Sequence, residues 1–286
     1  MRFPRHAPRD CAGPTGMFTI LTDPTDADVV AAIEGNMLAR YLLYRLCPEV
    51  EVHDDPDMLW TLSELGYATF NTVHRAQLPP GDCDRVIAEV MRRGRLKGVP
   101  LLWWIGPLSR PCDLGSRLTA LGWRSGEEQP GMAAELELLP VPSPIGGFRF
   151  RQVSSVDGLT TWWKLVCKAN SRPSGIVTHG ARCYTRLSLE PDSAMRCYLG
   201  WLGNEPVSTA CVVLGAGVAG LYGVATLQDA RKQGIGTAMT LKALQLAREM
   251  GYRWAVLRAS AEGAPLYRRL GFREYGKFST YLCEGR

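Results

Sequence analysis

The feature that most constrains this chain is a glycine turn between a predicted strand and a predicted helix. The turn reads R-K-Q-G-I-G over residues 231–236. An apolar run over 218–227 precedes it, and apolar residues at helical spacing over 237–250 follow it, with Gly251 as a stop signal. Glycine lets the backbone approach a ligand, and the free N–H groups and dipole of a helix's first turn attract an anion. The segment therefore predicts a phosphate site, although by itself it also fits an ordinary strand-to-helix turn.

The residues that follow the helix decide between these two interpretations. A predicted strand at 254–260 and a loop at 261–265 lead to the sequence L-Y-R-R-L-G-F over 266–272, and a last strand is predicted at 278–283. With these segments, the chain resembles the GCN5-related N-acetyltransferase (GNAT) family over roughly residues 147–286. In this resemblance, R-K-Q-G-I-G is the pyrophosphate loop and L-Y-R-R-L-G-F is the second signature. The implied fold is α/β (α+β), with a mixed, mostly antiparallel sheet flanked by helices.

The resemblance also implies a ligand and the residues that hold it. The co-substrate would be acetyl-CoA or another acyl-CoA, and no metal is implied. The strand before the loop is expected to part from its neighbour, so that its unpaired backbone groups bind the pantetheine arm. Ser260 stands where the family commonly has asparagine, and a solvated strand end is an equal alternative for it. The residues expected to bind the cofactor are Val224, Ala225, Thr226, Arg231, Lys232, Gln233, Gly234, Ile235, Gly236, Thr237 and Ser260.

Two catalytic residues are expected by the same reasoning. Tyr267 matches the family tyrosine that protonates the departing CoA thiolate, and a phenol of pKa near 10 is a suitable donor to a thiolate whose thiol has a pKa of about 8.5. Packing beside Leu270 and Phe272 is the alternative role. The attacking amine must be neutral, so some group has to accept a proton. Glu262 is the nearest carboxylate in the sequence, with His179 or a chain of water molecules as alternatives.

The first half of the chain echoes the second. A helical run at 86–93, an apolar strand at 101–105 and the sequence L-T-A-L-G-W at 118–123 repeat the same order. In place of the glycine loop, residues 78–85 read L-P-P-G-D-C-D-R, with aspartates where an anion would bind, and Leu118 stands at the tyrosine position. Like charges oppose anion binding. We therefore predict a second, degenerate GNAT-like domain that binds no cofactor; an unrelated α/β domain is the alternative.

Prolines and glycines mark the expected domain boundaries. Residues 1–16 show no hydrophobic periodicity and predict a flexible leader. Prolines at alternate positions, followed by two glycines, predict a linker at 140–147. The degenerate domain then spans 17–139 and the catalytic GNAT domain 148–286. Within the catalytic domain we expect a helix at 157–170 capped by an aspartate, a helix at 180–189, and a three-stranded antiparallel meander over 195–227.

Composition excludes several other classes of protein. The net charge of +5 comes from 33 Lys+Arg against 28 Asp+Glu and is spread along the chain, which suits an anionic small molecule better than nucleic acid. No apolar run reaches the roughly 18 residues of a membrane span, and the first residues do not resemble a signal peptide, so a cytoplasmic location is expected. The nine cysteines form no C-x-x-C pair, which indicates neither a zinc site nor a disulfide framework.

The function expected from these features is that of an acetyl-CoA-dependent N-acetyltransferase. It would transfer an acyl group to the amine of a small molecule by direct attack in a ternary complex. A non-catalytic acyl-CoA sensor, or a GNAT-fold enzyme that uses or decarboxylates another thioester, is the alternative. No nucleic-acid or membrane partner is expected. The sequence leaves the acceptor, the acyl group and the oligomeric state open, with a homodimer among the alternatives.

Overall fold

The computed structural model describes residues 19–190 and 192–285, so the predicted leader at 1–16 lies outside the described residues. The first half contains α1 (Asp26–Leu42), β1 (Val50–Asp55), β2 (Met58–Ser63), β3 (Thr72–His74), α2 (Cys83–Lys97), β4 (Leu101–Ile105), α3 (Leu114–Ala120) and β5 (Arg124–Glu135). The second half contains β6 (Phe148–Gln152), α4 (Val156–Ala169), α5 (Val177–Ser188), β7 (Met195–Leu202), β8 (Glu205–Gly215), β9 (Val218–Thr226), α6 (Ile235–Glu249), β10 (Trp254–Arg258), α7 (Ala264–Arg269) and β11 (Arg273–Cys283).

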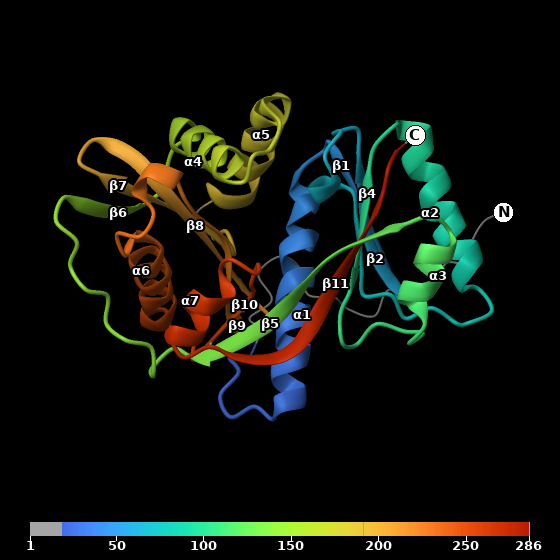
Figure 1. Ribbon diagram of the computed structural model, residues 1–286, viewed down its shortest axis with the longest axis horizontal. Helices are drawn as coiled ribbons and strands as arrows, with labels where there is room; N and C mark the ends of the chain where they lie inside the picture. Colours follow the sequence, from blue (N-terminus) through green and yellow to red (C-terminus); the bar gives the residue numbers. More distant parts are fainter. Residues whose placement is uncertain (1–18, 191, 286) are drawn as a thin grey trace.

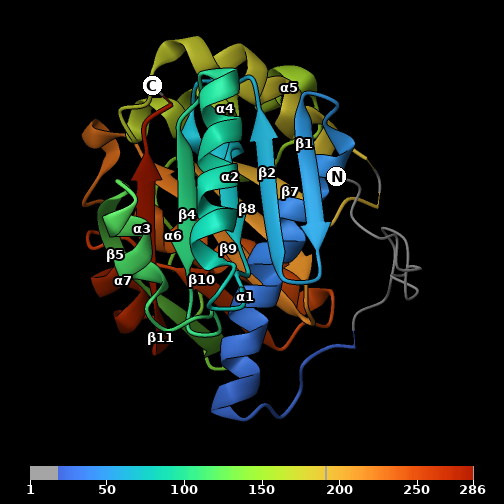
Figure 2. The ribbon, with the colours of Figure 1, turned by 90° about the vertical axis from the view of Figure 1, so that its right-hand side faces the viewer.

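The two halves repeat one order of elements, as the sequence predicted. Three antiparallel strands lead to a helix, a parallel strand, a short helix and a final long strand. The parallel pairs are β3 with β4 in the first half and β9 with β10 in the second. Figure 2 looks onto α2 and α3, which cover the first-half strands. The expected fold class, α/β with two similar units of mixed, mostly antiparallel strands, is confirmed.

The halves exchange their last strands, which the sequence did not predict. β5 ends the first half but pairs with β10, and β11 ends the second half but pairs with β4. β5 and β11 also pair with each other at the centre, so the described strands form one sheet of order β1-β2-β3-β4-β11-β5-β10-β9-β8-β7-β6. Figure 1 shows β11 crossing from the second half to the first-half strands. The strand β10 is therefore held on one side by a strand of the other half.

Side chains of β10 alternate between two hydrophobic clusters on opposite faces of the sheet. Ala255 and Leu257 pack with α6 and α7, whereas Val256 belongs to the cluster of α1, α4 and α5. A third cluster lies under α2 and α3. Helix α1 crosses the centre of the molecule and contacts β5, β8, β9, β10 and β11 (Figure 1). Among the described helices, none is both long and apolar enough to span a membrane.

The helices of the second half depart slightly from their expected bounds. Helix α4 was expected to begin with an aspartate cap at Asp157, and that expectation is wrong. Ser155 is the N-cap, because its backbone is extended and its Oγ accepts a hydrogen bond from the Gly158 N–H at 3.1 Å. Helix α5 begins at Val177, three residues earlier than expected. The three-stranded meander is confirmed as β7, β8 and β9, and residues 140–147 contain no helix or strand.

The strand exchange predicts that the two halves unfold together. Met132 lies on β5, in the first half, yet it is fully buried in the cluster under α6. We expect Met132→Ala to lower the free energy of unfolding by about 2 to 5 kcal/mol in a single transition that involves both halves. Leu138→Ala, at a position 76% exposed, is the control and should change it by less than about 0.5 kcal/mol.

Urea denaturation followed by far-UV and near-UV circular dichroism measures both effects. Two separate transitions, only one of which moves with Met132→Ala, would contradict the shared sheet as the source of the coupling.

Candidate functional site

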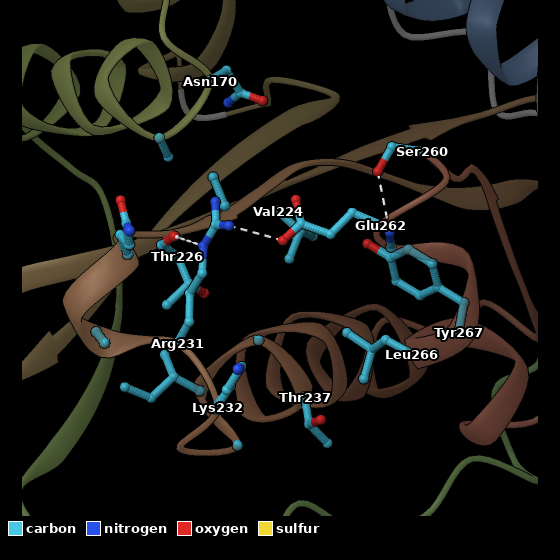
Figure 3. A pocket seen from close by; sticks show the side chains of 18 of the residues that line it. Asn170, Val224, Thr226, Arg231, Lys232, Thr237, Ser260, Glu262, Leu266 and Tyr267 are labelled. Carbon is cyan, nitrogen blue, oxygen red and sulfur yellow. Dashed lines mark hydrogen bonds and ion pairs between the residues drawn. The ribbon is translucent and has the colours of Figure 1, made fainter. Parts of the chain in front are cut away.

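A pocket of about 860 Å³ opens where β9 and β10 part (Figure 3). The two strands pair only through Ala219 with Ala255 and Gly220 with Val256. Beyond Gly220, β9 continues along β8 to Thr226, while β10 continues along β5 to Arg258. Each strand is thus held by its outer neighbour, and the β10-facing backbone of β9 has no strand partner there. The expected parting of these strands is present.

The pocket gathers nearly all of the residues that the sequence singled out. Every expected cofactor-site residue except Gln233 lines it, and so do Glu262 and Tyr267. The side chain of Gln233 instead donates a hydrogen bond to the Asp229 carbonyl at 3.3 Å. His179, the alternative base, is exposed on α5 and is not among the lining residues. Lining residues that the sequence analysis missed are Ala169, Asn170, Gln228, Ala230, Gly263, Leu266 and Arg269.

Some of the missed residues carried a signal in the sequence. Leu266 and Arg269 belong to the L-Y-R-R-L-G-F segment, whose first turn faces the pocket. Asn170 follows the last turn of α4, more than fifty residues before the glycine turn. Its side-chain nitrogen donates to the Val166 carbonyl at 2.8 Å, which ties it to the end of α4.

The N-terminus of α6 forms one wall of the pocket. Gly234 is its N-cap and has a φ of 77°, in the left-handed region that favours glycine. No side chain caps the helix, and among the described residues none accepts a hydrogen bond from the N–H groups of Ile235, Gly236 and Thr237. A side chain at Gly236 would point toward Leu266 and Thr226, both on the pocket wall. Uncapped donors and the positive end of the helix dipole therefore face the cavity.

The charges of the pocket are mainly positive. Arg231, Lys232 and Arg269 line it, against Glu262 as the one carboxylate among the described lining residues. Arg231 donates through Nε to the Thr226 carbonyl at 3.1 Å and through Nη1 to Glu262 Oε1 at 2.8 Å (Figure 3). The Glu262 side chain is 76% exposed, and exposed ion pairs contribute little free energy. An incoming polyanion therefore has only a weak pair to displace.

Tyr267 combines packing with access to the pocket. It lies on α7, is 8% exposed, and its ring meets Phe272 edge-on at 5.7 Å between ring centroids. Burial raises the pKa of Tyr267 to about 12, so its phenol is protonated at neutral pH and is available as a hydrogen-bond donor. Ser260, two residues after the end of β10, accepts a hydrogen bond from the Gly263 N–H at 3.2 Å and so fixes the turn into α7.

The corresponding helix end in the first half has the opposite charge pattern. Asp82 and Asp84 stand at the N-terminus of α2, where Arg85 pairs with Asp82 and Arg117 with Asp84, each at 3.0 Å. Leu118, at the position that corresponds to Tyr267, is fully buried. Carboxylates at this helix end oppose the binding of an anion. Over residues 19–190 and 192–285, no three His, Cys, Asp or Glu side chains gather as a metal site would require.

Comparison with known proteins finds a family model that matches part of the chain and solved structures with a similar fold. Residues 162–272 match the model of the acetyltransferase (GNAT) family. A GCN5-related N-acetyltransferase from Kribbella flavida is 20% identical, with a TM-score of 0.67 over 86% of this chain and 94% of that one. One from Sphaerobacter thermophilus is 18% identical, with a TM-score of 0.60 over 92% and 94%. Among curated proteins, none matches this sequence.

A third solved structure is similar over the whole repeat. It is described as a tandem GNAT protein from the clavulanic acid biosynthesis pathway, is 12% identical, and has a TM-score of 0.59 over 92% of this chain and 95% of that one. Identities this low establish the fold alone. The similar fold of this tandem structure agrees with the repeated order of elements in the two halves.

Proposed function

Because residues 162–272 carry a GNAT-family domain, we propose that the protein is an acetyl-CoA-dependent N-acetyltransferase that acts on the amine of a small molecule. The observation that carries this proposal is the cationic pocket at which the uncapped N-terminus of α6 meets the parted strands. Uncapped helix N–H groups next to Arg231 and Lys232 suit the diphosphate of a coenzyme. The β10-facing backbone of β9 beyond Gly220 supplies unpaired groups for an amide-rich arm.

In the proposed reaction, the neutral amine of the acceptor attacks the carbonyl carbon of the thioester. The C–N bond forms, the C–S bond breaks, and CoA leaves as a thiolate. Tyr267 donates a hydrogen bond to the developing thiolate. Its raised pKa keeps the proton on the phenol until negative charge appears on sulfur. The phenol thus stabilises the leaving group, and the amine loses its extra proton to a base.

Glu262 is proposed as that base, and its ion pair suggests how it becomes available. In the described structure its Oε1 accepts from Arg231 Nη1. A diphosphate at the N-terminus of α6 offers Arg231 more negative charge than one carboxylate does. Binding of the coenzyme would therefore draw Arg231 away and leave Glu262 free to accept a proton. Coenzyme binding and activation of the base are coupled in this proposal.

The pocket assignment predicts that a side chain at Gly236 blocks the coenzyme. Acetyl-CoA at about 100 times its dissociation constant should stabilise the wild type by about 2.7 kcal/mol, a rise of a few degrees in Tm. Gly236→Val should abolish this rise, because the new side chain enters the cavity beside Thr226 and Leu266. Gly81→Val, before the first-half helix α2 and with open space around it, is the matched control and should keep the full rise. If Gly236→Val shows the same rise in Tm with acetyl-CoA as the wild type, the glycine turn is not part of the binding site.

The proposed role of Tyr267 predicts a loss of turnover without a loss of binding. We expect Tyr267→Phe to lower kcat by about 100-fold while the thermal shift with acetyl-CoA is retained. Since the pKa of Tyr267 is raised to about 12, the phenol stays protonated over pH 7 to 10, and the ratio of wild-type to variant kcat should be constant over that range. A ratio that falls toward one with a midpoint near pH 10 would show that the phenol ionises as an exposed tyrosine does.

The proposed coupling predicts opposite effects of Glu262→Gln on binding and turnover. The variant frees Arg231, so acetyl-CoA should bind equally well or more tightly, while loss of the base should lower kcat by about 100-fold. Amine-dependent release of CoA thiol measures turnover, and calorimetry measures binding. An unchanged kcat would show that a group other than Glu262 accepts the proton of the attacking amine. Tight binding with no thiol release from the wild type, for any amine, would favour a non-catalytic sensor.

A further inference from the structure

Two arginines lie between the halves of the protein, on the face of the sheet opposite α6. Arg258 is the last residue of β10. Its neighbour Leu257 packs under α6, so the alternation of side chains sends Arg258 to the face covered by α1. Arg40 is on α1 itself and is 9% exposed. Both residues thus belong to the face of the sheet that α1 covers. Figure 1 shows the course of α1 across the sheet.

Arg258 is held by aromatic rings but has no acceptor for its buried N–H groups. Its Cζ lies 3.7 Å from the centroid of the Trp104 ring and 5.8 Å from that of Phe278. Its Nε and Nη1 are buried, and no described residue accepts a hydrogen bond from them. Burial lowers the pKa of the guanidinium, Tyr41 and Tyr222 raise it, and the nearby charge of Arg40 acts in the same direction as burial. A guanidinium in a protein nevertheless stays charged.

Arg40 is similarly short of partners. Its Nη2 donates to Tyr184 Oη at 2.8 Å, and its Cζ lies 5.1 Å from the ring centroids of both Tyr41 and Tyr222. Its Nε is buried without an acceptor among the described residues. His74, whose ring centroid is 4.0 Å from that of Tyr41, is also fully buried, and its Nδ1 has no partner. Several polar groups around the two arginines are therefore unsatisfied.

No carboxylate compensates for the two charges. Within the part of the chain that the structure describes, neither Arg40 nor Arg258 forms an ion pair with an acidic side chain. The buried acid of α1, Glu34, accepts instead from the Leu108 N–H at 2.8 Å. Aromatic rings offset part of the cost of burying a cation, but two neighbouring cations without an anion remain unfavourable. Among the described residues, the two guanidinium groups therefore have aromatic and phenolic neighbours but no anionic partner.

The position of the arginines relative to the pocket suggests which anion this is. Arg258 is two residues before Ser260, and Tyr222 is two residues before Val224; both Ser260 and Val224 line the pocket. Tyr222 packs with the cluster of α1, whereas Val224 packs with the cluster of α6, so the arginine cluster and the pocket flank the same parting of β9 and β10 from opposite faces of the sheet. A small molecule anchored at the arginines would reach the parted strands from the side away from α6.

We propose that Arg40 and Arg258 bind the acidic group of the acceptor, so that the acceptor is an amine with a carboxylate or phosphate group. This inference rests on the proposed N-acetyltransferase function. The planar fork of a guanidinium binds either kind of oxyanion through two parallel hydrogen bonds, and two guanidinium groups would fix the orientation of the acceptor. The acidic group would also satisfy buried N–H groups that have no partner in the protein.

The test compares amines that differ only in their acidic group. Glycine, β-alanine and 4-aminobutyrate are each measured beside the corresponding carboxamide and the corresponding aminoalkylphosphonate. Binding is measured by calorimetry in the presence of CoA, and turnover by amine-dependent release of thiol from acetyl-CoA. For at least one chain length, we expect the acid to bind at least about 30-fold more tightly than its carboxamide. A preference for the carboxylate or for the phosphonate tells which oxyanion is bound.

Substitution of Arg258 should remove this preference and leave the coenzyme site intact. Arg258→Met keeps a long apolar chain against Trp104, so we expect it to raise KM for the acid at least about 30-fold, to leave KM for the carboxamide unchanged, and to retain the thermal shift with acetyl-CoA. Arg273→Met is the matched control, because Arg273 is an exposed strand arginine with its Cζ 5.4 Å from the Tyr275 ring centroid. If Arg258→Met does not fold, Arg258→Lys keeps the charge without the fork and should weaken the preference.

Two results would overturn the inference. One is equal binding of acids and carboxamides by the wild type, and the other is an equal loss for both in Arg258→Met. Neither result affects the proposed function, which fails separately if no amine causes thiol release from acetyl-CoA. In that event, the calorimetric comparison of acid and carboxamide still tests the arginine site.

Discussion

The rest of the structure depends on the short parallel pairing between β9 and β10. Two pairs of residues hold these strands together, and beyond Gly220 each strand follows a different neighbour. Backbone groups that would satisfy one another in a continuous sheet are left facing a cavity. The N-terminus of α6 closes this cavity with uncapped N–H groups. The parted strands and the uncapped helix end together make a site with many N–H donors and few protein acceptors that occupy them.

The exchange of β5 and β11 between the halves of the chain keeps β9 and β10 apart. β10 is held on its outer side by β5, which pairs with it from Trp254 to Arg258, and the Ala259 N–H continues the contact by donating to the Pro130 carbonyl. β9 is held by β8 as far as Thr226. Closing the gap would break one of these ladders. The first half of the chain, whose own helix end carries paired aspartates, thus supplies a strand that shapes the pocket of the second half.

Local signals made much of the site predictable, and long-range choices did not. The glycine turn, α6 and the meander follow from turn residues and hydrophobic periodicity, which act over a few residues, and the segment with Tyr267 follows from the family resemblance. The exchange of β5 and β11 depends on which edge of the sheet each strand joins, a choice between residues far apart in the chain. The sequence analysis made no prediction about the surroundings of Arg258, because its contact with the Trp104 ring joins residues far apart in the chain. Gln233 lies within the predicted loop, but its side chain bonds to Asp229 and stays outside the pocket.

The central claim, that a coenzyme binds at the parting of β9 and β10, is tested most directly by hydrogen exchange with and without CoA. In the free protein, the amides of Ile235, Gly236 and Thr237 have no described acceptor and should exchange rapidly. We expect CoA to slow exchange there and along residues 221–226, and to leave the N-terminus of α2 unchanged. Slower exchange at α2 alone, or no change at either helix end, would contradict the claim.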